Sequence, residues 1–488
     1  MRRPWKVALR QRIDPSSQVP LYRQIAQAIV REIESGGLGR GEYLPSSRDL
    51  AEALGVNRKT VVLTFEDLVA QGWLETSGTR GTMVARTIRA PDPHLRAPEA
   101  DDAGTARVAY AYSPPPRHAP ARLASPSAVL DEGSPDGRLF PLDALTRAQR
   151  DATRRAFREN RLLYRDPRGS PMLREQIAAM LKTERGLPVT ADNICVTRGS
   201  QNGIYLAARA LVSRDDVVVV EELTYEPAVA AFSAHGARIL TVPLDRDGID
   251  VAALEEICRE HRVRAVFLTP HHQFPTTVSL RPERRLGVIE LSRRHGFAVI
   301  EDDYDHEFHF GSRPLLPMAS YAPEQVIYVG SLSKLLLPAL RIGYLAAPSA
   351  FIQVAASWVS LIDGLGNTLM EDAVAEIVGN GELRRHAKRA TQIYARRREA
   401  FAATLDASLG DVASFDMPDG GLAVWLRFRD QHVLDRTEER AAALGLRLAP
   451  SRSFAARKDA ASGLRLGFGS LAEDEARSAL ALLAEATA

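Results

Sequence analysis

The sequence contains little cysteine and no long apolar segment. Its two cysteines, Cys195 and Cys258, are too few for a disulfide framework or for a zinc site built from four cysteines. No run of about 18 apolar residues occurs, which argues against a membrane span. The first residues, MRRPWKVALRQRIDPSS, lack the apolar core of a signal peptide. We therefore expect a cytoplasmic protein that has no membrane partner.

The composition is that of a soluble globular protein with more than one domain. Hydrophobic residues make up 45% and charged residues 25% of the chain, whereas disordered chains are poorer in apolar side chains. The length of 488 residues exceeds the roughly 250–300 residues at which a single hydrophobic core stops growing. We expect two or three domains.

Basic charge is concentrated at the front of the chain. The net charge is only +2, yet residues 1–90 carry 14 Lys and Arg against 9 Asp and Glu. The remaining residues carry 49 basic against 52 acidic side chains. This asymmetry favours a polyanionic partner for the first segment.

Residues 17–86 show the pattern of a winged helix-turn-helix domain. Apolar side chains recur at helical spacing in residues 20–37, in LPSSRDLAEAL and in RKTVVLTFEDLVAQG, and the short turn GVN separates the last two. Ser46 is a candidate N-cap of the second helix, and Gly55 ends it. The segment WLETSGTRGTMVA has the pattern of two short strands around a glycine-bearing turn. Three helices followed by a β-hairpin predict an α+β DNA-binding domain.

The rest of the chain divides into a linker and a large domain. Residues 87–126 are rich in Pro and Ala without a sustained period, as in a semi-rigid linker. In residues 127–488, helical stretches alternate with segments rich in β-branched residues, which predicts an α/β domain with a mostly parallel central sheet. Residues from about 351 to 488 are helix-rich and suggest a smaller C-terminal α+β subdomain. The expected strands are NICVT, DVVVVE, RAVFLTP, FAVIEDD and QVIYVGS.

Two basic residues lie in an otherwise apolar segment, VIYVGSLSKLLLPALRIGYLAAP. A buried ammonium costs several kcal/mol unless it is paired, neutralised or covalently used. Lys334 follows a strand and a turn of small residues, so its amine is expected at the carboxyl end of a parallel strand, where open α/β sheets bind ligands. An acid-base role is possible there. A Schiff base with pyridoxal 5′-phosphate (PLP) also explains the apolar setting.

PLP requires a carboxylate beside its ring nitrogen, and one follows a neighbouring strand. The segment AVIEDDYDHEF places Asp302 directly after the strand FAVIE, and Tyr304 lies near enough to contact the phenolic oxygen of the ring. Adjacent strand residues point to opposite faces. Asp302 is therefore favoured over Asp303, although the pattern does not exclude Asp303.

The phosphate and the face of the ring also have candidate partners. CVTRGSQNGIYLAARAL has the pattern of a strand, a turn and a helix, with Ser200 and Gln201 at the helix N-terminus. Ser331 adds a hydroxyl group and Arg341 a guanidinium that binds phosphate through two hydrogen bonds. Tyr225, just past the strand DVVVVE, is the candidate that covers the ring.

These motifs resemble a known family. RGSQNGI, TPHHQFPTT, EDDYDHEF, GSLSK and LRLGFG are similar to the motifs of fold type I aminotransferases. Joined to a winged helix with PLYRQI, LPSSRDLAEALGVNRKTV and GWLETSGTRGT, they resemble the MocR/GabR subfamily of GntR-type transcriptional regulators. The resemblance implies a PLP-binding, aminotransferase-like effector domain that controls an N-terminal DNA reader. It also implies a head-to-tail homodimer.

The resemblance assigns roles to five residues. Lys334 is then the catalytic-position lysine that forms the internal aldimine, Asp302 the partner of the pyridinium nitrogen and Tyr304 the partner of the ring hydroxyl. Arg341 is a phosphate ligand. Arg465, in LRLGFG, matches the arginine that pairs with a substrate or effector carboxylate.

The sequence departs from the family pattern next to the expected ring. Thr277 replaces the glycine of the family's HQFPTG, and Phe274-Pro275 stands where aminotransferases carry Asn-Pro. Because that asparagine contacts the ring oxygen, efficient transamination is in doubt. We expect a transcriptional regulator that senses a small amino compound or PLP itself, and enzyme activity is left open. The alternative is an active aminotransferase that carries a DNA-binding fusion.

The DNA-reading residues follow from the helix-turn-helix pattern. A recognition helix presents its N-terminal residues to base edges in the major groove, and a wing reaches the backbone or minor groove. We expect contacts to a double-stranded operator from Arg48, Asn57, Arg58, Lys59, Thr60 and Arg80.

Two further motifs are candidates for a metal site and for a basic contact surface. His271 and His272 suggest a metal site, but consecutive strand side chains diverge, and His306 and His309 give no stronger signal, so no metal is expected. The basic segment 384–401 is expected on a solvated or dimer-facing surface, with a second DNA contact as the alternative.

Overall fold

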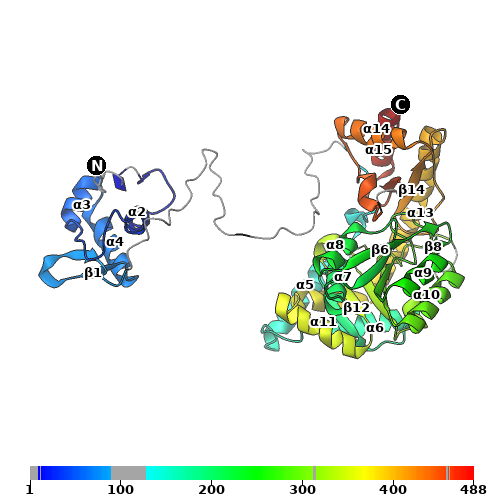
Figure 1. Cartoon of the computed structure of the whole chain (residues 1–488), viewed down its shortest axis with the longest axis horizontal. Helices are drawn as coiled ribbons and strands as arrows, with labels where there is room; N and C mark the ends of the chain where they lie inside the picture. The colour runs from blue at the N-terminus through cyan, green and yellow to red at the C-terminus, as the bar shows by residue number, and fades with distance from the viewer. Residues whose placement is uncertain are drawn as a thin grey trace. The chain divides into compact units, whose positions relative to one another are not determined.

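The computed structural model describes most of the chain as two separate bodies (Figure 1). The described residues are 9–10, 12–88, 111, 128–311, 315–332, 334–457, 460 and 462–488. The chain divides into two compact units, Met1–Ser113 and Pro114–Ala488. The predicted linker, 87–126, lies outside the described residues except for positions 87, 88 and 111. Within the described ranges, no helix is long and apolar enough to cross a membrane.

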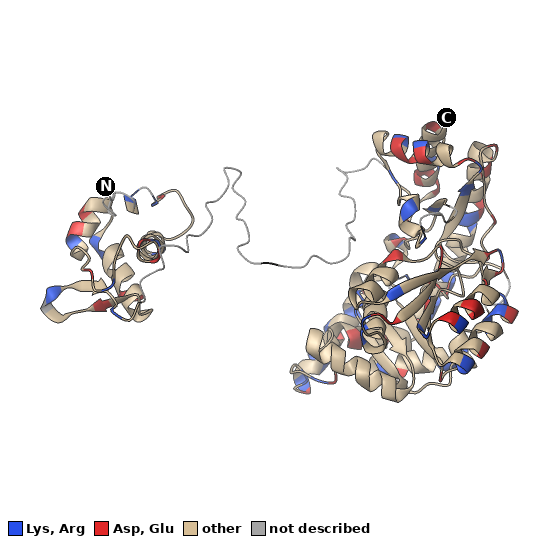
Figure 2. Ribbon diagram, viewed as in Figure 1, with Lys and Arg blue, Asp and Glu red and all other residues tan. Residues whose placement is uncertain are grey.

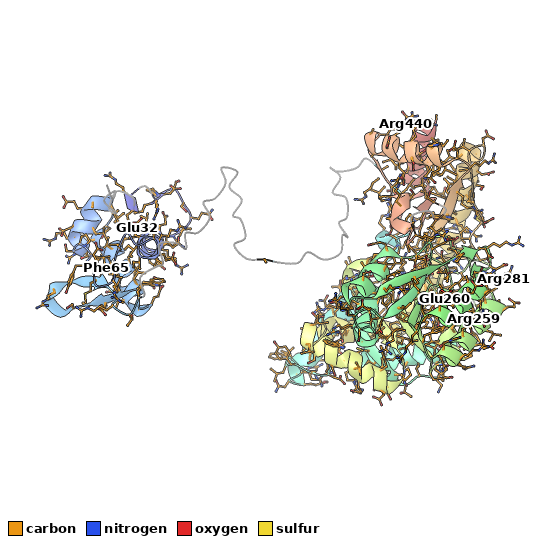
Figure 3. All side chains as sticks on the ribbon, viewed as in Figure 1. Glu32, Phe65, Arg259, Glu260, Arg281 and Arg440 are labelled. Carbon is orange, nitrogen blue, oxygen red and sulfur yellow. The ribbon has the colours of Figure 1, made fainter. Side chains whose placement is uncertain are left out.

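The first unit is the winged helix-turn-helix expected from the sequence. Its elements are α2 (Leu21–Glu34), α3 (Ser47–Leu54), α4 (Arg58–Ala70), β1 (Leu74–Thr76), the 3-10 turn η1 (Gly78–Arg80) and β2 (Thr82–Val84). Ser46 caps α3 by accepting a hydrogen bond from the Asp49 backbone N–H, and Gly55 ends it in the left-handed conformation. Strands β1 and β2 pair antiparallel to form the wing. Phe65 and Val61 of α4 are buried against the other helices (Figure 3).

A seven-stranded sheet forms the centre of the second unit. The strand order is β4-β12-β11-β10-β9-β5-β6, and every neighbouring pair is parallel except those of β12, which runs antiparallel to both β4 and β11. The mostly parallel sheet predicted from the sequence is therefore confirmed. The strand bounds are β4 (Ile194–Thr197), β5 (Val217–Glu221), β6 (Arg238–Val242), β9 (Val263–Leu268), β10 (Ala298–Asp303), β11 (Val326–Ser331) and β12 (Gly343–Ala346).

Both faces of this sheet are covered by helices. Val217 and Val219 of β5 belong to one hydrophobic cluster, whereas Val218 and Val220 belong to another, as expected for a strand that is buried on both sides. The flanking helices are α5 (Leu142–Arg158), α6 (Pro171–Arg185), α7 (Ser200–Leu211), α8 (Glu226–Ala234), α9 (Val251–Glu260), α10 (Pro282–His295), α11 (Ser349–Ile362) and α12 (Thr368–Gly379). A small hairpin joins β7 (Leu244–Asp245) to β8 (Gly248–Ile249).

A smaller α+β part follows in sequence. It contains α13 (Glu382–Leu409), β13 (Ala413–Ser414), β14 (Ala423–Phe428), α14 (Gln431–Ala443), β16 (Leu464–Gly467) and α15 (Glu473–Thr487), with the three strands in one antiparallel sheet. Strand β15 (Leu446–Arg447) pairs in parallel with β3 (Ala128–Val129), so the start of this unit lies against its C-terminal part. Helices α11 and α12 pack instead on α7, α5 and α6. The subdomain boundary near residue 351 stays a prediction.

Candidate functional site

A cavity opens at the carboxyl ends of the parallel strands. Its volume is about 630 Å³, and Tyr225 after β5, Phe274 after β9, Asp302 and Tyr304 at the end of β10, and Lys334 after β11 all line it. Sequence-distant residues meet here because the parallel strands β5, β9, β10 and β11 end at the same edge of the sheet. The sheet therefore brings together four of the residues predicted to bind the cofactor, and Ser200, a fifth, also lines the cavity.

Lys334 is the amine in this cavity. It is half-buried, and its Nζ donates a hydrogen bond to the Gly133 carbonyl at 2.6 Å and lies 5.0 Å from the centre of the Tyr304 ring. Burial lowers the pKa of Lys334, and the nearby Arg465 guanidinium lowers it further. A lowered pKa favours the neutral amine, which is the nucleophilic form.

Asp302 has a buried oxygen that lacks a partner. The residue is 4% exposed, and its Oδ1 accepts no hydrogen bond from any described residue. Burial raises the pKa of Asp302 to about 8, and Asp303 and Asp305 contribute, while Lys334 opposes the shift. An orphaned buried carboxyl oxygen that lines the cavity fits a ligand bearing a protonated ring nitrogen. Asp303 does not line the cavity, and its Oδ2 accepts a hydrogen bond from the Tyr328 hydroxyl at 2.5 Å.

The predicted phosphate ligands lie on two sides of Gly199. Helix α7 begins at Ser200, so its first backbone N–H groups lack partners within the helix and are available to an anion. Gly199 has φ +79°, and a Cβ there would lie 3.1 Å from the Arg341 guanidinium. Because of both its φ and this close approach, the turn requires glycine.

Arg341 and Gln201 face a second, neighbouring cavity. This cavity has a volume of about 670 Å³ and includes both residues and Tyr205 in its lining. Arg341 is exposed and donates a hydrogen bond to the Arg198 carbonyl at 2.8 Å, while the Gln201 amide donates to the Pro227 carbonyl at 2.8 Å. Their side chains thus do not line the Lys334 cavity. Ser331 is buried at the end of β11 and is also outside its lining.

Arg465 is buried next to Tyr304 and is not among the residues that line the cavity. It is 1% exposed, and its guanidinium donates hydrogen bonds to the carbonyls of Glu132 at 2.9 Å and Pro275 at 2.7 Å. A third hydrogen bond, of 3.2 Å, reaches the Tyr304 hydroxyl, which in turn donates to the His272 carbonyl at 2.9 Å. Neutral acceptors hold this cation, so an effector carboxylate that displaced them would gain a charge-assisted contact.

Sequence reasoning missed the part of the cavity wall that comes from the smaller α+β part. Asp131–Ser134 follow β3, and Leu448–Pro450 follow β15. The parallel pairing of β3 with β15 brings these two segments to the cavity. Neither segment carries a motif, and the pairing joins residues about three hundred positions apart, so no local signal identifies them.

The predicted DNA-reading residues lie at three neighbouring places in the first unit (Figure 2). Arg48, Arg58 and Lys59 are exposed at the starts of α3 and α4, and Arg58 Nε donates a hydrogen bond to Ser47 Oγ at 3.4 Å. Arg80 of the wing is exposed and lines a surface hollow together with Ser47. The start of α3, the start of α4 and the wing therefore form one surface.

Asn57 has a structural role at this surface. Its side chain caps α4 by accepting a hydrogen bond from the Lys59 backbone N–H at 2.9 Å. Thr60, one turn into the helix, is half-buried. Arg58 and Lys59 are thus the freest of the predicted residues on α4 to reach a DNA groove.

Comparison with known proteins identifies a family that contains both units. Residues 21–84 match bacterial regulatory proteins of the gntR family, and residues 128–449 match aminotransferase class I and II. The probable rhizopine catabolism regulatory protein MocR of Rhizobium meliloti is 31% identical over 426 residues, which cover 85% of this chain and 83% of that protein. The chain belongs to the MocR/GabR subfamily of GntR-type transcriptional regulators.

One further relative and one solved structure also match most of this MocR-type regulator. The HTH-type pyridoxine biosynthesis transcriptional regulator PdxR of Corynebacterium glutamicum is 30% identical over 478 residues, which cover 97% of each chain. The structure of Pyrococcus horikoshii kynurenine aminotransferase in complex with PMP has a TM-score of 0.68 and 28% identity, covering 75% of this chain and 91% of that one. The large unit is therefore a fold type I aminotransferase domain, and its cofactor is PLP.

Proposed function

We propose that this MocR-type regulator detects a small amino compound, or PLP itself, in the Lys334 cavity and converts occupancy into a change in operator binding. The observation that carries the proposal is the convergence of the Lys334 amine and the unpartnered Asp302 oxygen on one cavity. The same chain carries an exposed basic DNA-reading surface. We further propose that it acts in the cytoplasm, where an operator would be found.

Different residues of the cavity would hold different parts of the cofactor. When bound, PLP supplies an aldehyde that condenses with amines and a ring that withdraws electrons. Lys334 would offer the amine, Asp302 would accept a hydrogen bond from the ring nitrogen and Tyr225 would cover the ring. The backbone N–H groups in the first turn of α7 would hold the phosphate, and the Arg341 guanidinium lies close to Gly199 in the same turn.

The effector class follows from the charges around the cavity. An incoming amine competes with Lys334, so an effector other than PLP itself carries a primary amino group. Among the described residues, Arg465 donates hydrogen bonds only to neutral acceptors, and it therefore favours an effector with a carboxylate or sulfonate group. γ-Aminobutyrate-like and taurine-like compounds have both groups at opposite ends.

We propose a homodimer on the basis of an exposed apolar surface. Phe157, Leu163 and Tyr164, in and after the last turn of α5, are 75%, 72% and 88% exposed, and Leu361 at the end of α11 is 76% exposed. Tyr164 lies beside Gly364, which brings the two groups together. Large exposed apolar patches mark protein interfaces. A head-to-tail pairing of two chains at this apolar surface is our proposal for the assembly.

The experiment that tests the function measures operator binding and cofactor absorbance in the same samples. A footprint of the operator region is recorded for the PLP-loaded protein with and without γ-aminobutyrate, taurine, other amines and excess PLP. We expect at least one compound that changes the visible absorption of the bound cofactor to change the footprint too. A footprint that stays the same with every compound that perturbs the absorption would contradict a sensing role.

A second assay separates the regulator from the aminotransferase alternative. The protein is mixed with an amino donor and a 2-oxo acid, and product is followed over many turnovers. We expect no more than a single slow half-reaction. Sustained turnover would instead indicate an enzyme with a DNA-binding fusion.

A further inference from the structure

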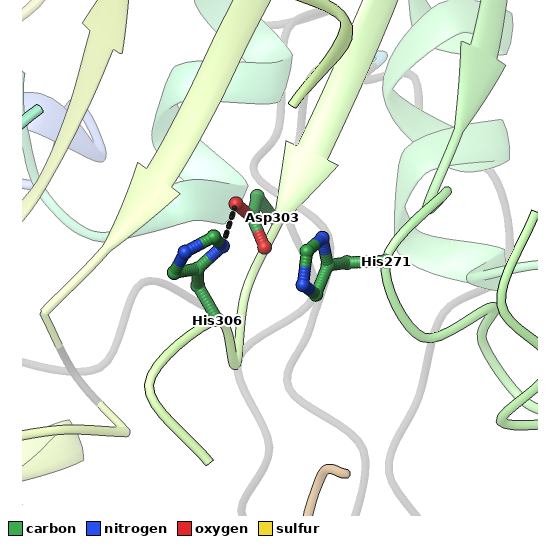
Figure 4. A group of neighbouring side chains, drawn as sticks. All are labelled: His271, Asp303 and His306. Atoms are coloured by element: carbon green, nitrogen blue, oxygen red, sulfur yellow. Dashed lines mark ion pairs between the residues drawn. The ribbon is translucent and has the colours of Figure 1, made fainter. Parts of the chain in front are cut away.

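A group of buried histidines and a carboxylate lies on the opposite side of β10 from the cavity face of Asp302. His271 follows β9, Asp303 is the last residue of β10, and His306 lies in the turn after it. The three residues are 4%, 3% and 8% exposed. One ligand atom of each lies within 4.8 Å of the others. Asp303 lies between the two imidazoles (Figure 4).

The facing atoms of this group lack hydrogen-bond partners. His271 Nε2, Asp303 Oδ1 and His306 Nδ1 are buried, and none has a partner among the described residues. His306 Nδ1 lies 2.9 Å from Asp303 Oδ2, which is ion-pair distance, but the contact is not aligned as a hydrogen bond. Buried polar atoms without partners are rare and costly in native proteins. Two such atoms, His271 Nε2 and Asp303 Oδ1, in a group whose three ligand atoms lie within 4.8 Å of one another indicate a shared ligand.

The charges around Asp303 favour a cation. Its Oδ2 already accepts the Tyr328 hydroxyl and lies 3.8 Å from Arg185 Nη1. Arg185 also pairs with Glu307, so its one positive charge is shared between two carboxylates.

We propose that His271, Asp303 and His306 form a binding site for a divalent transition-metal ion, with Zn²⁺ as the best fit. Two imidazole nitrogens and one carboxylate oxygen are a donor set that Zn²⁺ accepts, whereas Mg²⁺ and Ca²⁺ prefer oxygen ligands alone. A fourth position is open to water or to His309, whose ring centre lies 6.1 Å from that of His271. Both ring nitrogens of His309 lack partners among the described residues.

The ion would join two loops that line the cofactor cavity. His271 lies three residues before Phe274, and Asp303 and His306 flank Tyr304 in sequence. A metal bond between these loops holds Phe274, Asp302 and Tyr304 in fixed relative positions. The site therefore supports the cavity without touching the cofactor, and it is independent of which effector the regulator detects.

The test uses the full PLP-loaded chain after removal of metals with a chelator and of free PLP by gel filtration. Zn²⁺ and Mg²⁺ are titrated by calorimetry, and the metal content and thermal midpoint are measured. We expect the wild type to bind one Zn²⁺ per chain at this site and to gain thermal stability, with no response to Mg²⁺. His271→Asn and His306→Gln should each bind Zn²⁺ at least tenfold more weakly, whereas His432→Gln, an exposed control on α14, should match the wild type.

Two results would overturn the proposal. One is a wild type that binds no Zn²⁺, and the other is a Zn²⁺ affinity that both variants retain in full. Where the variants fail to fold, X-ray absorption at the zinc edge of the wild type decides the matter. A spectrum with two imidazole ligands supports the site, and one without histidine ligands excludes it.

Discussion

At the scale of single residues, Asp302 should make the folding stability of the cofactor-free protein depend on pH. Its pKa in the folded protein, about 8, lies above the value of about 3.9 for an unfolded chain. Between these values the folded state holds a proton that the unfolded state lacks. The stability associated with this group is therefore fully present below about pH 4 and is lost as the pH rises through about 8.

Asp302→Asn removes this titration. In the cofactor-free protein, we expect the free energy of unfolding to fall less steeply with pH in the variant, by up to about 1.4 kcal/mol per pH unit for one proton. Urea unfolding at several pH values between 5 and 9 measures the difference. Burial also raises the pKa values of Glu221 and Glu301, to about 8 and about 7. Because both residues are present in both proteins, their contributions to the pH slope cancel in the comparison. Equal slopes in the two proteins would show that Asp302 is not held protonated.

The positions of site residues were predictable where a strand end fixes them. Lys334 follows β11 and Asp302 lies at the end of the neighbouring strand β10, so their meeting follows from the pattern of a parallel sheet alone. The directions of the Gln201 and Arg341 side chains depend on how the turn at Gly199 packs, which no periodicity encodes. The His271, Asp303 and His306 group was missed because its members come from two loops, whereas the sequence argument considered the adjacent pair His271 and His272.

At the scale of elements, the close approach of β12 to the first turn of α7 should control cofactor affinity. A Cβ at Gly343 would lie 2.6 Å from the carbonyl carbon of Gly199 and 2.8 Å from the backbone nitrogen of Ser200. These are backbone atoms, so the turn that holds the phosphate must shift. We expect Gly343→Ala to weaken PLP binding at least tenfold in an absorbance titration.

Gly311→Ala is the matched control for this substitution, because a Cβ there meets no atom of the described residues within 4 Å. It should bind PLP as the wild type does. Equal affinity in both variants would mean that the first turn of α7 does not hold the phosphate.

A second prediction at this scale concerns the recognition helix α4. Arg58 is exposed on its first turn, and an arginine that binds a guanine edge contributes about 1–3 kcal/mol of discrimination. Arg58→Ala should therefore weaken operator binding by about tenfold or more and reduce the preference over unrelated DNA. Arg58→Lys keeps the charge but loses the forked geometry, so it should restore non-specific affinity without restoring the preference. Competition binding at one fixed salt concentration measures both, and an Arg58→Ala protein with full preference would place the specific contact elsewhere.

Five of the seven strands of the central sheet were predicted from the sequence, and β6 and β12 were not. The five expected strands all occur, because their runs of β-branched residues are bounded by turns. The sequence analysis missed β12, whose segment RIGYLAAP has no alternation and was treated as part of an apolar run. A strand buried on both faces gives no period-2 signal.

At the scale of the whole molecule, the exposed apolar surface at the ends of α5 and α11 should hold two chains together. We expect the wild type to be a dimer in solution. The double variant Tyr164→Asp/Leu361→Asp should dissociate at least tenfold more readily, because both side chains are almost fully exposed in the single chain. Sedimentation at several protein concentrations measures the equilibrium.

Leu286→Asp provides the control, since Leu286 is 61% exposed on α10, away from α5 and α11 in sequence. It should leave the dimer intact. A wild type that is monomeric, or a dimer that resists the double variant, would exclude this surface as the interface.

The most direct test of the account is to locate the cofactor on the chain. The PLP-loaded protein is reduced with borohydride, digested and mapped by mass spectrometry, and the chain has only six lysines among which the label must be assigned. The account predicts a single labelled residue, Lys334, a label that decreases when an effector amine is added before reduction, and no visible absorption band in Lys334→Ala. A protein that stays colourless with PLP, or a label on another lysine, would contradict it.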